Sequence, residues 1–92
     1  MTKHELEKKL KAVGFVPDND YYIYGCYDDL TASISTENGV ELLEIGTLAN
    51  FAKMPISLID EVRFGLEDDG INIMLYAFNK NIVSYISFPI DN

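Results

Sequence analysis

The sequence is short of the residues that most often build catalytic or metal sites. It has one cysteine, one histidine and no tryptophan among 92 residues. The single cysteine, Cys26, has no partner for an internal disulfide, which fits a reducing compartment. His4 and Cys26 together fall short of the four ligands of a structural zinc site. We therefore expect no cofactor and no metal site.

Long apolar runs are also missing. No segment approaches the roughly 18 consecutive apolar residues that a membrane span needs. The first residues, Met1 to Glu5, lack the apolar centre of a signal peptide. We expect a cytoplasmic protein that makes no membrane contact.

Basic residues are scarce, with seven against 15 acidic residues and a net charge of -8. Four of the lysines fall within the first eleven positions, so residues 12–92 hold three basic residues against thirteen acidic ones, a net charge of -10. Such a surface repels phosphate backbones, so direct binding of nucleic acid is not expected. The same field attracts a basic protein surface, including one that normally holds nucleic acid.

Motifs of known catalytic mechanisms are absent. The sequence has no glycine-rich phosphate loop, no Gly-x-Ser-x-Gly and no His-Glu-x-x-His. Paired carboxylates such as Asp28-Asp29 could serve in acid-base chemistry, but neighbours on a strand point to opposite faces. We expect no catalytic residues and no enzyme activity.

The N-terminal segment predicts a helix over Thr2 to Val13. Thr2 and Glu5 have capping-box spacing, Leu6, Leu10 and Val13 share one face, and Gly14 suits the residue after the helix. Residues 17–20, Pro-Asp-Asn-Asp, are typical of a loop.

Residues 21–45 predict a three-stranded antiparallel meander. Tyr21 to Tyr27 is the first strand, with Gly25 marking a bulge or a close backbone approach, and Asp28-Asp29 is expected to turn the chain. Alternation from Leu30 predicts the second strand, and Asn38-Gly39 indicates a type I′ hairpin that leads to the third.

Residues 46–88 predict a second helix followed by three strands. Thr47 as a cap with Leu48, Phe51 and Ala52 favours one or two helical turns before Pro55. Residues 57–64 fit either a helix capped by Ser57 or a strand, and a helix there would leave five strands. The strands of residues 62–88 are joined by the Asp69-Gly70 turn and by residues 79–81.

The predicted fold is α+β and forms one domain over residues 1–92. It is an antiparallel sheet of five to six short strands, built from two successive helix-then-three-strand halves, with the N-terminal helix packed on one face.

The candidate partner-binding residues are carboxylates near turns and two tyrosines that alternate on one strand. Tyr22 and Tyr24 share a strand face, which is either exposed as the centre of a binding patch or buried as core. The full predicted set is Asp18, Asp20, Tyr22, Tyr24, Asp28, Asp29, Glu67, Asp68 and Asp69.

In size, acidity and the order of a helix followed by three strands, the chain resembles the small anti-CRISPR proteins of phages and mobile elements. The resemblance assigns no role to any single residue. It implies a non-enzymatic inhibitor or regulator, a possible nucleic-acid mimic that occupies a basic surface of its partner, acting as a monomer or homodimer.

Two other hypotheses stay open. The first is a structural or assembly subunit that self-associates through a sheet edge such as Ile82 to Phe88, which is lightly defended against pairing. The second is a hydrolase that uses clustered carboxylates and a divalent metal.

Overall fold

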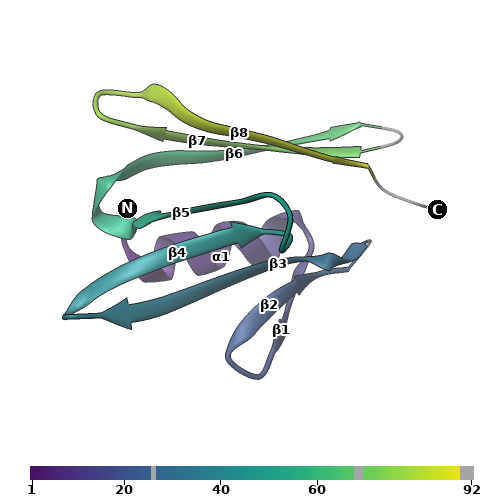
Figure 1. The fold of residues 1–92 in the computed structure, drawn as a ribbon, viewed down its shortest axis with the longest axis horizontal. Coiled ribbons are helices and arrows are strands. Elements are labelled where there is room, and N and C mark those ends of the chain that lie inside the picture. The colour runs from purple at the N-terminus through teal and green to yellow at the C-terminus, as the bar shows by residue number, and fades with distance from the viewer. Residues whose placement is uncertain (26, 68–69, 90–92) are drawn as a thin grey trace.

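The computed structural model describes residues 1–25, 27–67 and 70–89, and within them the chain forms one helix, one 3-10 turn and eight strands (Figure 1). The strands divide into a five-stranded sheet, β1-β2-β3-β4-β5, and a three-stranded sheet, β6-β7-β8, which we call sheet A and sheet B. All strand pairs are antiparallel. The predicted α+β class is confirmed, but the described residues form eight strands in two sheets rather than the single sheet of five to six strands expected.

Helix α1 (Lys3–Val13) forms as the sequence predicted. The N–H of Glu5 donates to Thr2 Oγ1 at 3.2 Å, and the N–H of Thr2 donates back to the Glu5 carboxylate at 3.4 Å. Gly14 ends the helix with φ of 118°, in the left-handed region that favours glycine. Leu6 and Leu10 are completely buried, so the predicted apolar face does cover the core.

Sheet A contains the predicted meander of residues 21–45 as β2 (Tyr21–Tyr24), β3 (Tyr27–Glu37) and β4 (Val40–Gly46). The Asn38-Gly39 turn has φ of 52° and 79°, as a type I′ hairpin requires. The predicted close approach at Gly25 is also present, because its N–H donates to the carbonyl of Gly14 at 3.0 Å.

Three local predictions in sheet A were wrong. Residues 17–20 are not all loop, because β1 (Phe15–Asp18) pairs with β2, and Pro17 is tolerated there because β1 is an edge strand. Asp28 and Asp29 do not turn the chain but lie within β3. The expected helical turns before Pro55 are instead a hairpin turn over residues 47–50 followed by β5 (Phe51–Pro55).

The chain passes from sheet A to sheet B through the 3-10 turn η1 (Ile56–Leu58), whose Ile56 side chain is buried. Sheet B follows as β6 (Ile59–Glu67), β7 (Gly70–Ala77) and β8 (Asn81–Pro89). Residues 59–64 are therefore strand, which settles the alternative left open by the sequence. The second helix that the sequence predicted is absent from the described residues of this half. Asp69, the first residue of the predicted Asp69-Gly70 turn, lies outside the described residues.

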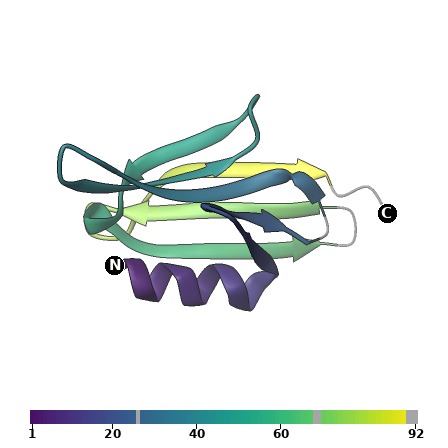
Figure 2. The ribbon, with the colours of Figure 1, turned by 90° about the horizontal axis from the view of Figure 1, so that it is seen from below.

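The two sheets form separate layers that share one core (Figure 1). Leu43 and Ile45 of sheet A and Ile71, Ile73 and Leu75 of sheet B are almost fully buried. Helix α1 runs along the β6 side of sheet B and contacts β1 and β6, closing one side of the core (Figure 2). The helix thus lies at one side of the two layers, where β1 and β6 meet it, rather than on one face of a single sheet as expected, and no helix of the described residues covers the outer face of either sheet (Figure 2).

Candidate functional site

The outer face of sheet A is made by alternate residues of its strands. Leu30, Ala32 and Leu43 point inward and are buried. Their neighbours on β3, β4 and β5 form two cross-strand rows on the opposite face, Thr31–Gly46–Phe51 and Ser33–Glu44–Lys53. Because strand residues alternate between faces, these rows face away from sheet B.

A hollow of about 610 Å³ lies on this outer face, and we call it the acidic trough. It forms where Gly46 contributes no side chain between Thr31 and Phe51. Its walls come from the start of β3, the middle of β4 and the β4–β5 turn. The described lining residues are Tyr27, Asp28, Asp29, Thr31, Ser33, Glu44, Gly46, Thr47, Leu48, Ala49 and Phe51.

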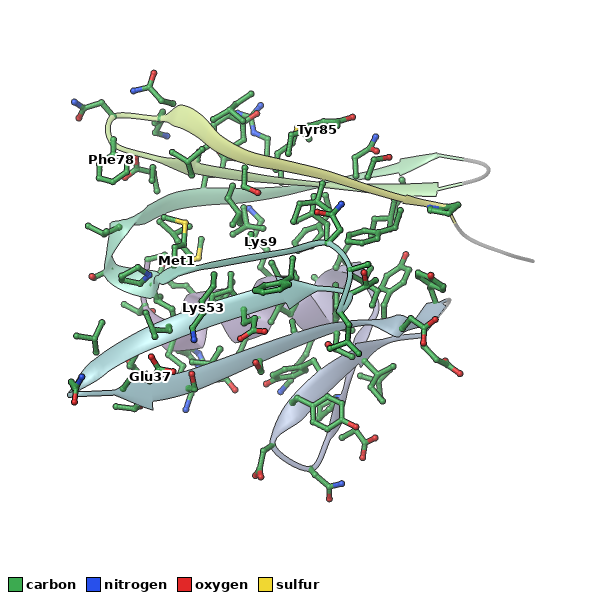
Figure 3. All side chains as sticks on the ribbon, viewed as in Figure 1. Met1, Lys9, Glu37, Lys53, Phe78 and Tyr85 are labelled. Atoms are coloured by element: carbon green, nitrogen blue, oxygen red, sulfur yellow. The ribbon has the colours of Figure 1, made fainter. Side chains whose placement is uncertain are left out.

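The trough has three carboxylates, from Asp28, Asp29 and Glu44, and none of its described lining residues is basic. Lys53 lies directly across the β4–β5 pair from Glu44, but its Nζ donates to the Glu37 carboxylate at 3.2 Å (Figure 3). Within the described part of the chain, no hydrogen bond or ion pair engages the three trough carboxylates. A cation from another molecule would therefore meet carboxylates that are free to pair with it.

The apolar part of the trough suits a long basic side chain. The Phe51 side chain is 51% exposed, and Leu48 is fully exposed on the β4–β5 turn. Lysine and arginine lay their methylene stems on such surfaces while their charged heads stay at polar groups. The hydroxyls of Thr31 and Ser33 add acceptors beside the carboxylates. The arrangement can hold a basic segment of a protein.

A metal ion has no comparable site in the part of the chain that the structure describes. No group of three or more histidine, cysteine, aspartate or glutamate side chains gathers there closely enough to hold one.

The structure separates the predicted site residues into several places. Asp28 and Asp29 are exposed at the trough. Asp18 and Asp20 flank the β1–β2 turn, away from the trough, and Asp20 lines a second hollow of about 410 Å³. Glu67 ends β6, and Asp68 and Asp69 lie outside the described residues.

Of the two predicted tyrosines, Tyr24 lies in the core and Tyr22 contacts helix α1. Tyr24 is 3% exposed, and its ring centroid lies 5.2 Å from that of Phe15. Tyr22 is half-buried, and its hydroxyl donates to Glu7 Oε2 at 2.6 Å. This bond to Glu7, with burial and the nearby negative charge, raises the pKa of Tyr22 to about 12. Of the two interpretations of this strand face, burial is the one observed.

Sequence reasoning missed Glu44 and Phe51 as members of the site. The signal for Glu44 was present, because it alternates with Leu43 and Ile45 and so had to face away from the core. No local signal exists for Phe51, since its place depends on β5 pairing with β4.

No helix in the described residues is long and apolar enough to cross a membrane. No protein-family model, curated protein or solved structure significantly matches the chain.

Proposed function

We propose that this protein is a non-enzymatic binding module that inhibits or regulates a partner by occupying a basic surface of it. The acidic trough and the surrounding outer face of sheet A would form the contact. A protein surface that holds nucleic acid is the class of partner that fits best, because it already presents arginine and lysine side chains to negative charge.

The charge distribution supports this proposal. Residues 15–55, which build sheet A, contain seven acidic residues and one basic residue, a net charge of -6. That one basic residue, Lys53, is paired with Glu37. A field of one sign over a whole sheet speeds the encounter with a positive partner and orients it.

The single observation that carries the proposal is the trough itself. Asp28, Asp29 and Glu44 gather at one hollow beside the exposed ring of Phe51, with no cation among the described lining residues. Acidic residues that serve only solubility need neither a shared hollow nor an adjacent aromatic surface.

A deca-lysine peptide with a fluorescent label tests the site. Replacing Asp28→Asn, Asp29→Asn and Glu44→Gln together should weaken peptide binding about 10- to 100-fold, since exposed charge pairs contribute up to roughly 1 kcal/mol each. Binding is followed by fluorescence anisotropy at low salt.

The matched control removes three other carboxylates of sheet A, through Asp18→Asn, Asp20→Asn and Glu41→Gln. Both triple variants have the same net charge, so the control should lose only a few-fold in affinity through the long-range field. Equal losses in the two variants would show that net charge alone governs binding and would remove the trough from the proposal.

A further inference from the structure

Each sheet has two edge strands, β1 and β5 in sheet A and β6 and β8 in sheet B. The outward backbone groups of an edge strand can pair with another strand, and proteins protect them with charge, proline or a covering element. Three of the four edges have such protection: β1 has Pro17 and Asp18, β5 has Lys53 and Pro55, and β6 has four charged residues and contacts with α1.

Strand β8 has the least protection of the four, since its one such residue is Pro89 at its last position. From Asn81 to Phe88 it has no charged residue and no proline, in a chain of which 24% is charged. Tyr85 is 60% exposed and Ile82 is 56% exposed. The Tyr85 side chain lies on the outer side of sheet B (Figure 3), across the strand pair from Met74.

Met74, opposite Tyr85 on this outer face, is uncharged, and Arg63, the next residue in the same cross-strand row, is already paired. Arg63, across from Met74 on β6, donates to Glu61 at 3.0 Å and lies 4.9 Å from the Tyr76 ring centroid. A partner that binds by charge therefore finds little on β8, whereas a partner that binds by backbone pairing finds a strand whose outer edge pairs with no other strand of the described residues.

The half of β8 beyond Ser84 is the part best placed to pair. The register of β7 with β8 shifts at Val83, which is left without a partner residue, so the strand is irregular there. Val83 and Ser84 also face β5 across a hollow of about 300 Å³. Residues 85–88 continue past both features in regular register with β7.

We propose that two copies of this chain pair antiparallel through residues 85–88 of β8, so that their two B sheets join into one continuous sheet. A strand paired antiparallel with its own copy obeys a two-fold axis and needs no second sequence. Directly opposed residues share a face, so a register centred on Ile86 places Tyr85 opposite Ser87 of the second copy, both on the outer face.

The negative net charge of the chain favours the uncharged β8 edge for this contact. Each copy has a net charge of -8, so two copies repel each other wherever their acidic surfaces meet. An uncharged strand keeps the repelling groups away from the interface. The dimer is therefore expected to tighten as salt screens the remaining repulsion.

Sedimentation equilibrium of the full chain, from micromolar to millimolar concentration at low and high salt, tests the proposal. The mass should rise toward that of a dimer, and more so at high salt. Two variants carry like charges at the opposed positions, Tyr85→Lys with Ser87→Lys and Tyr85→Glu with Ser87→Glu. Each alone should dimerise at least about tenfold more weakly, and an equal mixture should recover the wild-type affinity as a heterodimer.

The matched control makes the same chemical change on sheet A, Tyr21→Lys with Ser35→Lys, at positions that are also exposed. It should dimerise like the wild type, and thermal melts should show that all variants fold. A chain that stays monomeric in every condition overturns the proposal, and the edge would then be open only to a strand of another protein. A dimer that survives both β8 variants uses another surface and also overturns it.

Discussion

The bond between Tyr22 and Glu7 links strand β2 to helix α1 through a single hydroxyl. The donor and acceptor are fifteen residues apart and 2.6 Å from each other, and both side chains are half-buried. A hydrogen bond to a charged acceptor is stronger than one between neutral groups. The bond therefore adds a polar contact between helix α1 and sheet A to the apolar packing of Leu6 and Leu10.

Replacing Tyr22→Phe removes this hydroxyl and keeps the ring. The free energy of unfolding at neutral pH should fall by about 1 to 2 kcal/mol, because the Glu7 carboxylate loses its partner but can still reach water. Urea denaturation followed by circular dichroism measures the change. Tyr21→Phe is the control, since Tyr21 is more exposed, and it should have almost no effect.

The same residue predicts a pH dependence. The pKa of Tyr22 is raised to about 12 in the folded chain, chiefly by its bond to Glu7, against about 10 when unfolded. The stabilisation is thus complete below pH 10 and is lost as the pH rises toward 12. The stability difference between wild type and Tyr22→Phe should shrink over that range, and a constant difference would contradict the assignment.

The sequence could place Tyr22 and Tyr24 on one face but not say which face was covered. Strand alternation is local, so it can be read from consecutive residues. The covering helix and sheet B come from distant parts of the chain, so the burial of Tyr24 depends on tertiary packing. The predicted acidic residues lie at separate places for the same reason. Successive turns of an antiparallel meander lie at opposite ends of the strands, so carboxylates that are near in sequence are not near in space.

Among the elements, the hairpin at Asn38-Gly39 was predictable and the one at residues 47–50 was not. The first depends on two residues that both tolerate positive φ. In the second, the N–H of Asn50 donates to Thr47 Oγ1 at 3.2 Å, the same spacing that caps a helix. The local hydrogen bond is common to both structures, and only the pairing of β5 with β4 distinguishes them.

Gly46 is the residue on which this second hairpin and the floor of the trough depend. Its φ is 139°, and a Cβ there would lie 2.3 Å from the carbonyl oxygen of Asn50 and 2.5 Å from Phe51 Cα. Gly46→Ala should lower the free energy of unfolding by more than about 3 kcal/mol, since it combines backbone strain with a clash against main-chain atoms.

Gly39→Ala provides the comparison for that prediction. Gly39 also has positive φ, at 79°, but nothing lies within 4 Å of the position of a Cβ. Gly39→Ala should therefore lower the free energy of unfolding only by the strain of placing a Cβ at positive φ, about 1 to 2 kcal/mol. The loss of stability in both variants is measured by urea denaturation. Equal losses would show that the main chain near Gly46 shifts to accept a Cβ without a further loss of stability, which would contradict the prediction.

At the scale of the whole molecule, the charge layout could be read from the sequence but the division into two sheets could not. The acidic excess of residues 15–55 and the uncharged run of β8 are plain in the sequence. The point of division is a single 3-10 turn at Ile56–Leu58 that carries the chain from one layer to the other. The sequence of this turn is compatible with a helix start or a strand, so it does not indicate that the chain changes layer there.

The two proposed contacts lie on different layers, which leads to a prediction about their combined behaviour. The acidic trough faces outward from sheet A, and the pairing edge belongs to sheet B. A dimer would therefore still present both troughs, and each chain should bind one deca-lysine peptide whether it is monomeric or dimeric. Isothermal titration calorimetry below and above the dimerisation range should give the same stoichiometry per chain.

Salt should move the two equilibria in opposite directions. Peptide binding joins opposite charges and weakens as the Debye length falls from about 10 Å at 0.1 M salt to about 3 Å at 1 M, whereas dimerisation joins like-charged chains and strengthens. Measuring both constants over one salt series separates the proposals. Peptide affinity that does not change with salt would contradict a charged trough, and dimerisation that weakens with salt would place the contact on charged residues instead of β8.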